Sequence, residues 1–168
     1  MTGDAVHREP ARGLAAVDLD GVLADVRHRL HHVRSRPKDW SAFFAAAADD
    51  LVLEDGRVVA DRLALDHDLL YLSGRPERCR VDTEDWLRRH GLPPAPVWLR
   101  PEGDHRPARQ LKVDLLRRLQ RDQPVAVLVD DDPAVCAAAE QAGFTVFRAT
   151  WMTEQPTLYE AQETDGRS

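Results

Sequence analysis

The sequence lacks the features that mark several special classes of protein. It contains two cysteines, Cys79 and Cys136, which form no CxxC pair and have no histidine at metal-binding spacing. We therefore expect both to be buried free thiols. No apolar stretch approaches the ~20 residues that span a membrane, and the first residues have no apolar centre of a signal peptide. These absences predict a cytoplasmic protein that has no membrane partner.

A surplus of positive charge is also lacking. The formal net charge of −6 excludes a protein that coats nucleic acid through bulk electrostatics, although a local basic patch can still bind a polyanion. The 168 residues show no break in composition, and this length suits one compact domain.

Short apolar runs alternate with longer amphipathic segments along the chain. The runs are Leu14–Val17, Leu69–Leu72, Pro96–Leu99, Val125–Val129 and Thr145–Phe147. Runs that are apolar throughout are typical of parallel strands covered on both faces. The segments between them predict helices, with proline near the start and glycine after the end in Pro76–His90 and Pro133–Ala142, and a leucine stripe in Pro107–Arg121. The pattern predicts an α/β fold with a doubly wound, Rossmann-like parallel sheet.

An insert of about residues 26–66 separates the first two predicted strands and predicts a small, mainly helical cap. Trp40, Phe43 and Phe44 fall on one side of a helix within it. The segment LVLEDGRVVADRLAL permits a hairpin at Asp55-Gly56, but we favour a helix because a parallel sheet needs a crossover before Leu69. The folded domain would span 13–150, between an N-terminal tail, 1–12, and a polar, loosely held C-terminal tail, 151–168.

Three of the predicted strands end in charged or hydroxyl side chains. These are Asp18 and Asp20 after the first strand, Ser73 and Arg75 after the second, and Asp130, Asp131 and Asp132 after Val125–Val129. The carboxyl ends of parallel strands meet at one edge of the sheet, so these groups converge. Gathered carboxylates need a cation, and oxygen ligands favour Mg²⁺. The sequence therefore predicts a magnesium site.

A hard dication among such groups suits a phosphate ester. Lys112, which borders the buried face of its helix, and Arg75 would neutralise phosphate oxygens while a carboxylate attacks phosphorus. Asp18 is the better nucleophile because it comes directly off the strand. Asp20, pointing the same way along an extended chain, would protonate the leaving group and then take a proton from water.

These elements together resemble the haloacid dehalogenase (HAD) superfamily of phosphatases: DLDGV from Asp18, then Ser73, Lys112 and the pair Asp130-Asp131. More narrowly, DLDGVLAD, YLSGRPE, TEDWLRRHGLP, LRPEGDHRPARQLK and LVDDDPAV look like the phosphatase domain of phage-type polynucleotide kinase 3′-phosphatases.

The resemblance implies roles for individual residues. Arg29, nine residues after Asp20, and Arg75 would bind substrate. The metal would be held by the Asp18 side chain, the Asp20 backbone carbonyl and Asp131, with Asp130 as a further candidate ligand.

The chain departs from the family pattern in two ways. Ala108 stands four residues before Lys112, where an acidic residue is expected. The kinase loop GxxxxGK[ST] is absent, so we expect a stand-alone phosphatase domain, with a separate kinase or ligase as a candidate partner.

The insert bears on the substrate. Its basic stretch contains Arg27, Arg29, Arg34, Arg36 and Lys38, interleaved with three histidines. This stretch either tracks a phosphodiester backbone or forms a solvated helix face. The sequence predicts an Mg²⁺-dependent phosphomonoesterase that removes a 3′-terminal phosphate from nucleic acid. Two alternatives stay open: a phosphatase of nucleotides or sugar phosphates, and a quiescent nucleic-acid-binding module. The complete set of charged site residues argues against quiescence.

Overall fold

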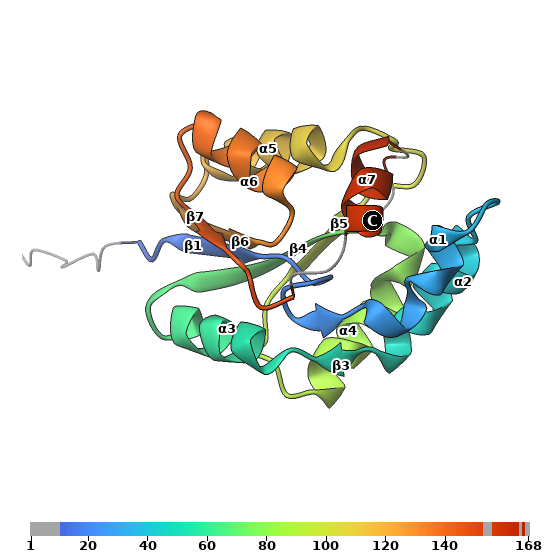
Figure 1. Ribbon diagram of the computed structural model, residues 1–168. Helices are drawn as coiled ribbons and strands as arrows, with labels where there is room; N and C mark the ends of the chain where they lie inside the picture. Colours follow the sequence, from blue (N-terminus) through green and yellow to red (C-terminus); the bar gives the residue numbers. More distant parts are fainter. Residues whose placement is uncertain (1–10, 153–155, 165, 167–168) are drawn as a thin grey trace, which may run out of the picture.

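A five-stranded parallel sheet forms the centre of the computed structural model, which describes residues 11–152, 156–164 and 166 (Figure 1). The strand order is β5-β4-β1-β6-β7. The strands are β1 (Leu14–Val17), β4 (Asp68–Pro76), β5 (Val97–Arg100), β6 (Val125–Asp130) and β7 (Val146–Arg148). Each predicted apolar run overlaps one of these strands, although Pro96 and Thr145 fall one residue before β5 and β7. Strand β4 continues four residues past its run, through Ser73 and Arg75.

Helices cover both faces of the sheet, as the alternating pattern predicts. Helices α5 (Ala108–Leu119) and α6 (Pro133–Gln141) lie on one face, and α3 (Glu54–Asp66) and α4 (Arg80–Arg89) on the other (Figure 1). The predicted helix over Pro76–His90 begins as the short 3-10 helix η3 (Glu77–Cys79) before α4. The predicted α/β class and doubly wound sheet are confirmed.

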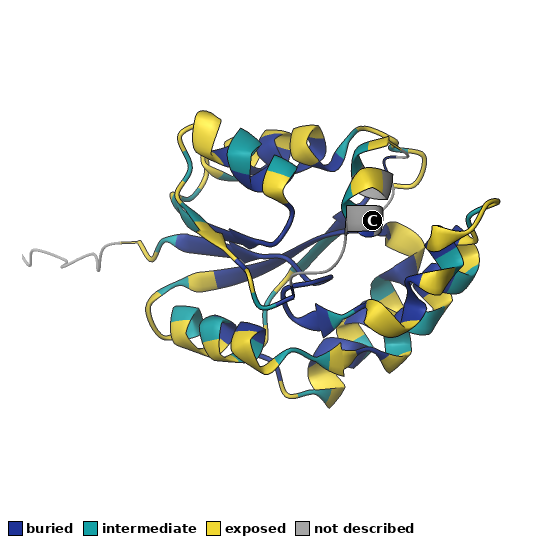
Figure 2. Cartoon of the chain, viewed as in Figure 1, coloured by how far each residue is buried: buried dark blue, intermediate teal, exposed yellow. Residues whose placement is uncertain are grey.

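The central strand contributes to both layers of the core. Ala15 and Val17 pack in the cluster that contains Trp86 of α4, whereas Ala16 packs with Leu116 of α5. All three strand residues are 0% exposed, and Figure 2 shows the strands as the most continuously buried part of the chain. Alternate residues of β1 therefore serve opposite faces, which explains why the run is apolar throughout.

The insert between β1 and β4 is mainly helical, as predicted, with one small ribbon. Its elements are β2 (Ala24–Asp25), η1 (Arg27–Arg29), α1 (His31–Arg34), α2 (Trp40–Ala45), η2 (Ala46–Asp49), β3 (Leu51–Val52) and α3. The antiparallel β2–β3 pair was not predicted, because two residues a strand leave no period to detect. Trp40, Phe43 and Phe44 gather in one buried cluster.

The ambiguous segment after β3 is a helix. Helix α3 includes Asp55 and Gly56, so the helical prediction is right and the hairpin is wrong. A Cβ at Gly56 would lie 1.9 Å from the carbonyl oxygen of Val22, so glycine permits the helix to pack closely on the chain after β1.

The end of the chain differs from the predicted loose tail. Helix α7 (Pro156–Thr164) follows, and its Leu158 is 0% exposed in the cluster that holds Phe43. Glu163 accepts a hydrogen bond from Arg109 of α5 at 2.6 Å. The polar composition concealed this helix, because among its described residues one buried leucine, the Glu163 ion pair and a hydrogen bond from Tyr159 hold it.

Two predictions from absent features can be compared with the structure. Cys79 and Cys136 are buried free thiols, as predicted. In the described ranges, no helix combines the length and apolar character needed to cross a membrane.

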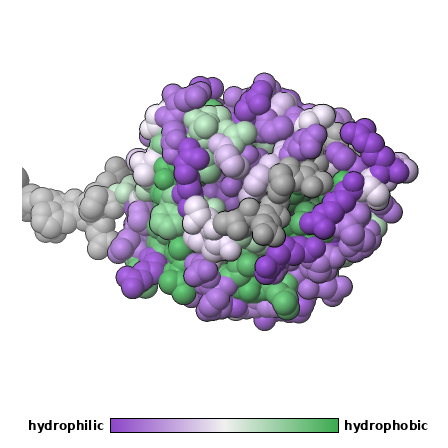
Figure 3. Space-filling view, viewed as in Figure 1, coloured by the Kyte–Doolittle hydropathy of each residue, from purple (hydrophilic) through white to green (hydrophobic). Residues whose placement is uncertain are grey.

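The surface is mostly hydrophilic, with hydrophobic residues gathered toward one edge of the sheet (Figure 3). There Val58, Val59, Leu63, Val127 and Phe147 line an apolar groove of about 300 Å³. Phe147 of β7 is 47% exposed.

Candidate active site

Asp18 is fixed at the carboxyl end of the central strand. Its backbone N–H donates to the carbonyl of Val129 in β6 at 2.9 Å, which continues the strand pairing one residue beyond β1. The residue is 3% exposed. Its carboxylate therefore projects from a rigid position at the edge where ligands bind in parallel sheets.

The chain turns back immediately after Asp18. The carbonyl of Leu19 accepts hydrogen bonds from Val22, Leu23 and Ala24 at 3.2, 2.9 and 2.8 Å. The extended backbone therefore ends within two residues of Asp18. Asp18 precedes the turn and Asp20 lies within it, and their carboxylates contact different partners.

Gly21 permits this turn to approach the other acidic strand end. Its φ is +83°, and a Cβ at this position would lie 2.1 Å from Oδ2 of Asp131. Glycine is needed here both for the left-handed backbone and for the space that the Asp131 carboxylate occupies.

Three carboxylates converge where β1 and β6 end. Asp18, Asp130 and Asp131 each offer an oxygen, and these oxygens lie within 4.8 Å of one another. Nζ of Lys112 lies 2.6 Å from Oδ2 of Asp130 and 3.2 Å from Oδ2 of Asp18. The structure thus brings together four residues that the sequence predicts from three separate segments.

The balance of charge in this cluster favours a bound cation. Burial raises the pKa of Asp18 to about 8, although Lys112 beside it acts in the opposite direction. Burial and the charge of Asp18 also raise the pKa of Asp131. One ammonium cannot compensate three buried carboxylates, so a dication would favour their ionised forms.

The donors fit the predicted Mg²⁺. All are carboxylate oxygens, the ligand type that a small hard dication prefers. Asp130 already accepts from Lys112 and, through Oδ1, from the backbone N–H of Asp132 at 3.0 Å. Asp18 and Asp131 are therefore the better candidates to hold the ion. The Asp20 carbonyl as a third ligand stays a prediction.

Ser73 lies near the carboxyl end of β4, the strand beside β1. It is 1% exposed, and its Oγ accepts a hydrogen bond from the backbone N–H of Arg75 at 3.2 Å. Val17 pairs with Tyr71, so Ser73 comes two residues after the last pair that joins β4 to β1, at the edge of the sheet where Asp18 lies. Its predicted hydroxyl role fits this position.

A second charged cluster joins the insert to the sheet. Oδ1 of Asp20 accepts hydrogen bonds from Arg29 at 2.8 Å and from Nε of Arg75 at 2.9 Å. Asp50 accepts from Arg29 at 2.8 and 2.7 Å and from Arg75 at 3.0 Å. All four residues are at most 2% exposed. We call this set the seam network.

The seam network fixes the charge of Asp20. Burial alone would raise its pKa, but Arg29 and Arg75 hold it well below its usual range. Asp20 is therefore an ionised carboxylate with two guanidinium partners. Arg29, predicted to bind substrate, is 0% exposed and is not part of an exposed basic track.

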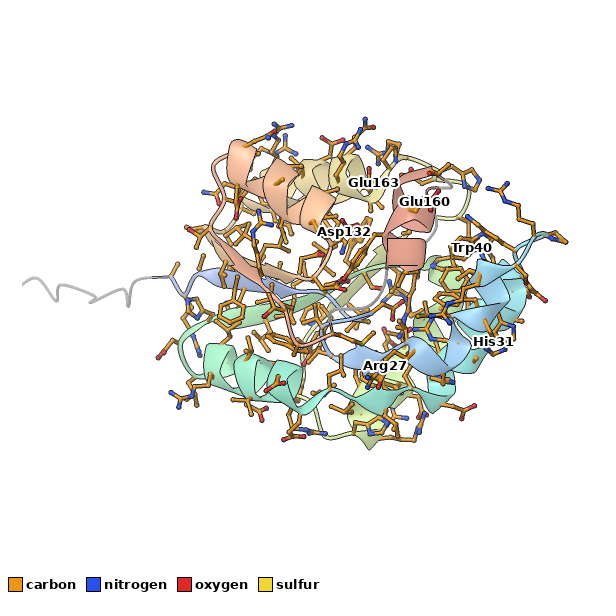
Figure 4. All side chains as sticks on the ribbon, in the orientation of Figure 1. Arg27, His31, Trp40, Asp132, Glu160 and Glu163 are labelled. Atoms are coloured by element: carbon orange, nitrogen blue, oxygen red, sulfur yellow. The ribbon has the colours of Figure 1, made fainter. Side chains whose placement is uncertain are left out.

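Sequence reasoning missed two residues at the site. Asp50 follows another aspartate at the end of an alanine-rich segment, and its partner Arg29 lies 21 residues away, so no local pattern marks it. Tyr159, in the expected tail, donates a hydrogen bond from its hydroxyl to Oδ2 of Asp131 at 2.9 Å. Figure 4 shows Asp132 close to α7, which carries Glu160 and Glu163.

Comparison with protein-family models decides the family. Residues 14–151 match the polynucleotide kinase PNKP phosphatase domain of the HAD superfamily. The chain belongs to this family. The resemblance predicted from its motifs is confirmed, and the family supports a phosphatase over the quiescent binding module.

Solved structures share the fold of this HAD phosphatase at low identity. A chain of the Pnkp1/Rnl/Hen1 RNA repair complex is 20% identical with a TM-score of 0.67, and the match covers 88% of this chain and 46% of that chain. The class C acid phosphatase from Bacillus anthracis is 15% identical with a TM-score of 0.62, over 94% and 74% of the two chains. These values show a common fold.

A further HAD-family enzyme was solved in complex with magnesium and inorganic phosphate. This protein, the bt-2542 Asp-to-Ala mutant from Bacteroides thetaiotaomicron, is 10% identical with a TM-score of 0.54, over 87% of this chain and 97% of that chain. None of the curated proteins compared with the chain matches it. The chain spans slightly under half of the repair-complex chain that it matches.

Proposed function

We propose that this phosphatase removes 3′-terminal phosphate groups from nucleic acid through an aspartyl-phosphate intermediate. The observation that carries the proposal is the position of Asp18, which leaves the central strand at the acidic cluster with Nζ of Lys112 3.2 Å from its carboxylate. A carboxylate nucleophile beside a fixed cation suits attack on a phosphate ester.

The proposed reaction has two displacements. In the first, an oxygen of Asp18 forms a bond to phosphorus while the ester bond breaks. The leaving 3′-oxygen takes a proton from water, because Asp20 is ionised beside Arg29 and Arg75 and has no proton to donate. In the second, water attacks the acyl phosphate, Asp20 takes the water proton, and the bond between phosphorus and Asp18 breaks to release phosphate.

The other residues hold the reacting groups in place. Lys112 and Ser73 would bind phosphate oxygens, and Arg29 and Arg75 would orient Asp20 through their hydrogen bonds to Oδ1. Mg²⁺ held by Asp18 and Asp131 would neutralise charge on the transferred phosphoryl group. Direct substrate binding by Arg29 and Arg75 stays a prediction.

The family supports a nucleic-acid substrate, because its model describes the phosphatase domain of a polynucleotide kinase. Arg34 and Arg36 of the insert are exposed, and Nζ of Lys38 lies 6.0 Å above the ring of Trp40. These cations supply a surface for a polyanion. The repair-complex neighbours support a separate ligase as partner.

A small phosphate ester is the second candidate substrate. One observation favours it: Asp18, Asp131 and Lys112 are each at most 9% exposed, so the chemistry lies under cover. A compact molecule reaches such a site more readily than a polymer end.

A substrate panel separates the two candidates. We would compare kcat/KM for a 3′-phosphorylated oligonucleotide, a nucleoside 3′-monophosphate, a sugar phosphate and an aryl phosphate in Mg²⁺. We expect the oligonucleotide to be preferred, and a preference for the sugar phosphate or mononucleotide would contradict the polynucleotide proposal.

The nucleophile is tested with Asp18→Asn, using Asp66→Asn on the exposed end of α3 as the matched control. Activity should fall at least about 1,000-fold in the first variant and stay at the wild-type level in the second. Acid-quenched enzyme should carry phosphate only when Asp18 is present. Retained Mg²⁺-dependent hydrolysis in Asp18→Asn would show that another group attacks phosphorus.

A further inference from the structure

Arg100, the last residue of β5, is a buried cation whose identified partners are neutral. It is 3% exposed. Nε donates to the carbonyl of Gly74 at 3.2 Å, and Nη1 donates to the carbonyls of Asp104 and Arg106 at 3.1 and 2.8 Å. Among the described residues, Nη2 has no hydrogen-bond partner. One donor of this guanidinium is therefore buried and unused.

The contrast with the seam network makes Arg100 unusual. Arg29 and Arg75 are equally buried, but each contacts Asp20 and Asp50. Burial, with the nearby charge of Arg106, lowers the pKa of Arg100 to about 10, although the charge of Asp104 acts in the opposite direction. Burying a cation without an anionic partner costs stability. A guanidinium in these surroundings is suited to receive an anion.

A small pocket lies against Arg100. It has a volume of about 30 Å³ and is lined in part by Phe44 of the insert, Gly74 of β4 and His105. This volume suits a single oxygen-sized group, not a whole phosphate. The pocket therefore favours an oxyanion that inserts one oxygen and keeps the rest of its bulk outside.

The acidic residues beside the pocket have cationic partners of their own. Glu102 pairs with Arg78 at 3.1 Å, and Asp104 pairs with Arg106 at 2.8 Å. These pairs reduce the negative potential that would repel an incoming anion. Arg100 lines the pocket with a buried guanidinium, whereas Glu102 and Asp104 are paired with other arginines.

The pocket stands at a suitable distance from the reacting centre. Strand β5 neighbours β4, and β4 neighbours β1, so β5 and β1 are roughly 10 Å apart laterally at ~4.8 Å per strand. Tyr71 pairs with both Val17 and Val97, so Arg100 lies three residues beyond the level of Val17, and the two strand ends are roughly 14 Å apart. The Arg100 side chain shortens this distance, because its Nε reaches the carbonyl of Gly74. Gly74, which contacts Arg100, lies between Ser73 and Arg75. A second phosphate of the same substrate can reach Arg100 while the first lies at Asp18.

We propose that Arg100 binds one non-bridging oxygen of the phosphodiester that precedes the 3′-terminal nucleoside. This inference rests on the proposed polynucleotide substrate. The 5′-phosphate of a nucleoside 3′,5′-bisphosphate offers the same chemistry at the same position and is the other source of such an oxyanion.

The experiment measures kcat/KM for four substrates: a nucleoside 3′-monophosphate, a nucleoside 3′,5′-bisphosphate, a dinucleotide 3′-phosphate, and the same dinucleotide with a neutral methylphosphonate linkage. In the wild type, the dinucleotide should exceed the 3′-monophosphate roughly 10- to 100-fold, the gain typical of a charge-assisted hydrogen bond. The methylphosphonate should lose most of this gain, and this comparison needs no variant.

Arg100→Gln should bring the dinucleotide-to-monophosphate ratio near one, and Arg100→Lys should give an intermediate ratio. Arg88→Gln, at an exposed position of α4, should keep the wild-type ratio.

The inference is wrong if the wild-type dinucleotide gain survives in Arg100→Gln or with the methylphosphonate, and in that case the polynucleotide proposal stands. A gain for the bisphosphate alone, lost in Arg100→Gln, would keep the oxyanion site and contradict the polynucleotide substrate. A wild type with no gain for either would contradict both.

Discussion

The hydroxyl of Tyr159 donates a hydrogen bond to Oδ2 of Asp131, joining helix α7 to the acidic cluster across 28 residues of sequence. The same helix buries Leu158 among residues of the insert and pairs Glu163 with Arg109 of α5. Helix α7 therefore connects the insert, the central domain and a candidate metal ligand.

Tyr159→Phe should weaken Mg²⁺ binding. Removal of the hydroxyl leaves the Asp131 carboxylate less firmly oriented, and losing an outer partner of a metal ligand typically costs 10- to 100-fold in metal affinity. We expect the Mg²⁺ concentration for half-maximal activity to rise by about tenfold, with kcat at saturating Mg²⁺ close to the wild-type value. An unchanged Mg²⁺ titration would show that the contact does not orient Asp131.

Asp50→Asn should destabilise the fold. The substitution leaves Arg29 and Arg75 buried with one carboxylate instead of two, and breaking a buried ion pair costs about 3–5 kcal/mol. Urea denaturation measures the loss. Asp49→Asn is the matched control, because Asp49 is the adjacent aspartate and its side chain is exposed. This control should change stability by less than about 0.5 kcal/mol. Equal effects would contradict a structural role of the seam network.

Gly21→Ala should abolish activity, whereas Gly91→Ala should not. Both glycines have positive φ, 83° and 64°, so each substitution carries a backbone cost of about 1–2 kcal/mol. A Cβ at Gly21 meets Asp131, while a Cβ at Gly91 meets nothing within 4 Å. Activity and urea denaturation of the two variants separate the steric effect on the site from backbone strain. Full activity of Gly21→Ala would contradict the close approach to Asp131.

Stability without metal should fall as pH rises from about 5 to 8. The pKa of Asp18 is raised from 3.8 to about 8, so the folded state binds its proton more tightly than the unfolded state, and this stabilisation is lost as pH rises through 8. Asp20 has a lowered pKa, so its contribution is complete above pH 5 and stays constant.

Mg²⁺ should reverse this loss most strongly near pH 8. At 100 times Kd, a ligand that binds the folded state alone stabilises it by about 2.7 kcal/mol. Thermal unfolding in EDTA and in Mg²⁺ across this pH range tests the expectation. A Mg²⁺ effect equally large at pH 5 would contradict competition between the ion and protons on the acidic cluster.

The positions of the five strands along the chain and the convergence of Asp18 and Asp131 follow from the sequence, because buried parallel strands leave apolar runs and carry their polar residues at one edge. Lys112 follows from the leucine stripe that sets the buried face of its helix. The order of the strands in the sheet was not predicted. The separate surroundings of Asp18 and Asp20 do not follow from the sequence, because the turn at Gly21 depends on contacts with distant segments. Asp50 and Tyr159 were missed for the same reason. Their functions arise from partners that sequence spacing does not relate.

The seam network also limits how the insert can move and how its four residues can change among related chains. Arg29 and Asp50 belong to the insert, whereas Asp20 lies in the turn after β1 and Arg75 in β4. Swinging the insert away from the sheet as a hinged unit would break the pairs Arg29–Asp20 and Arg75–Asp50, whose four residues are at most 2% exposed. The insert is therefore expected to stay closed during turnover. In hydrogen exchange, the backbone amides of the insert should exchange only in the openings that also expose the amides of the sheet. Related chains should change these four positions jointly.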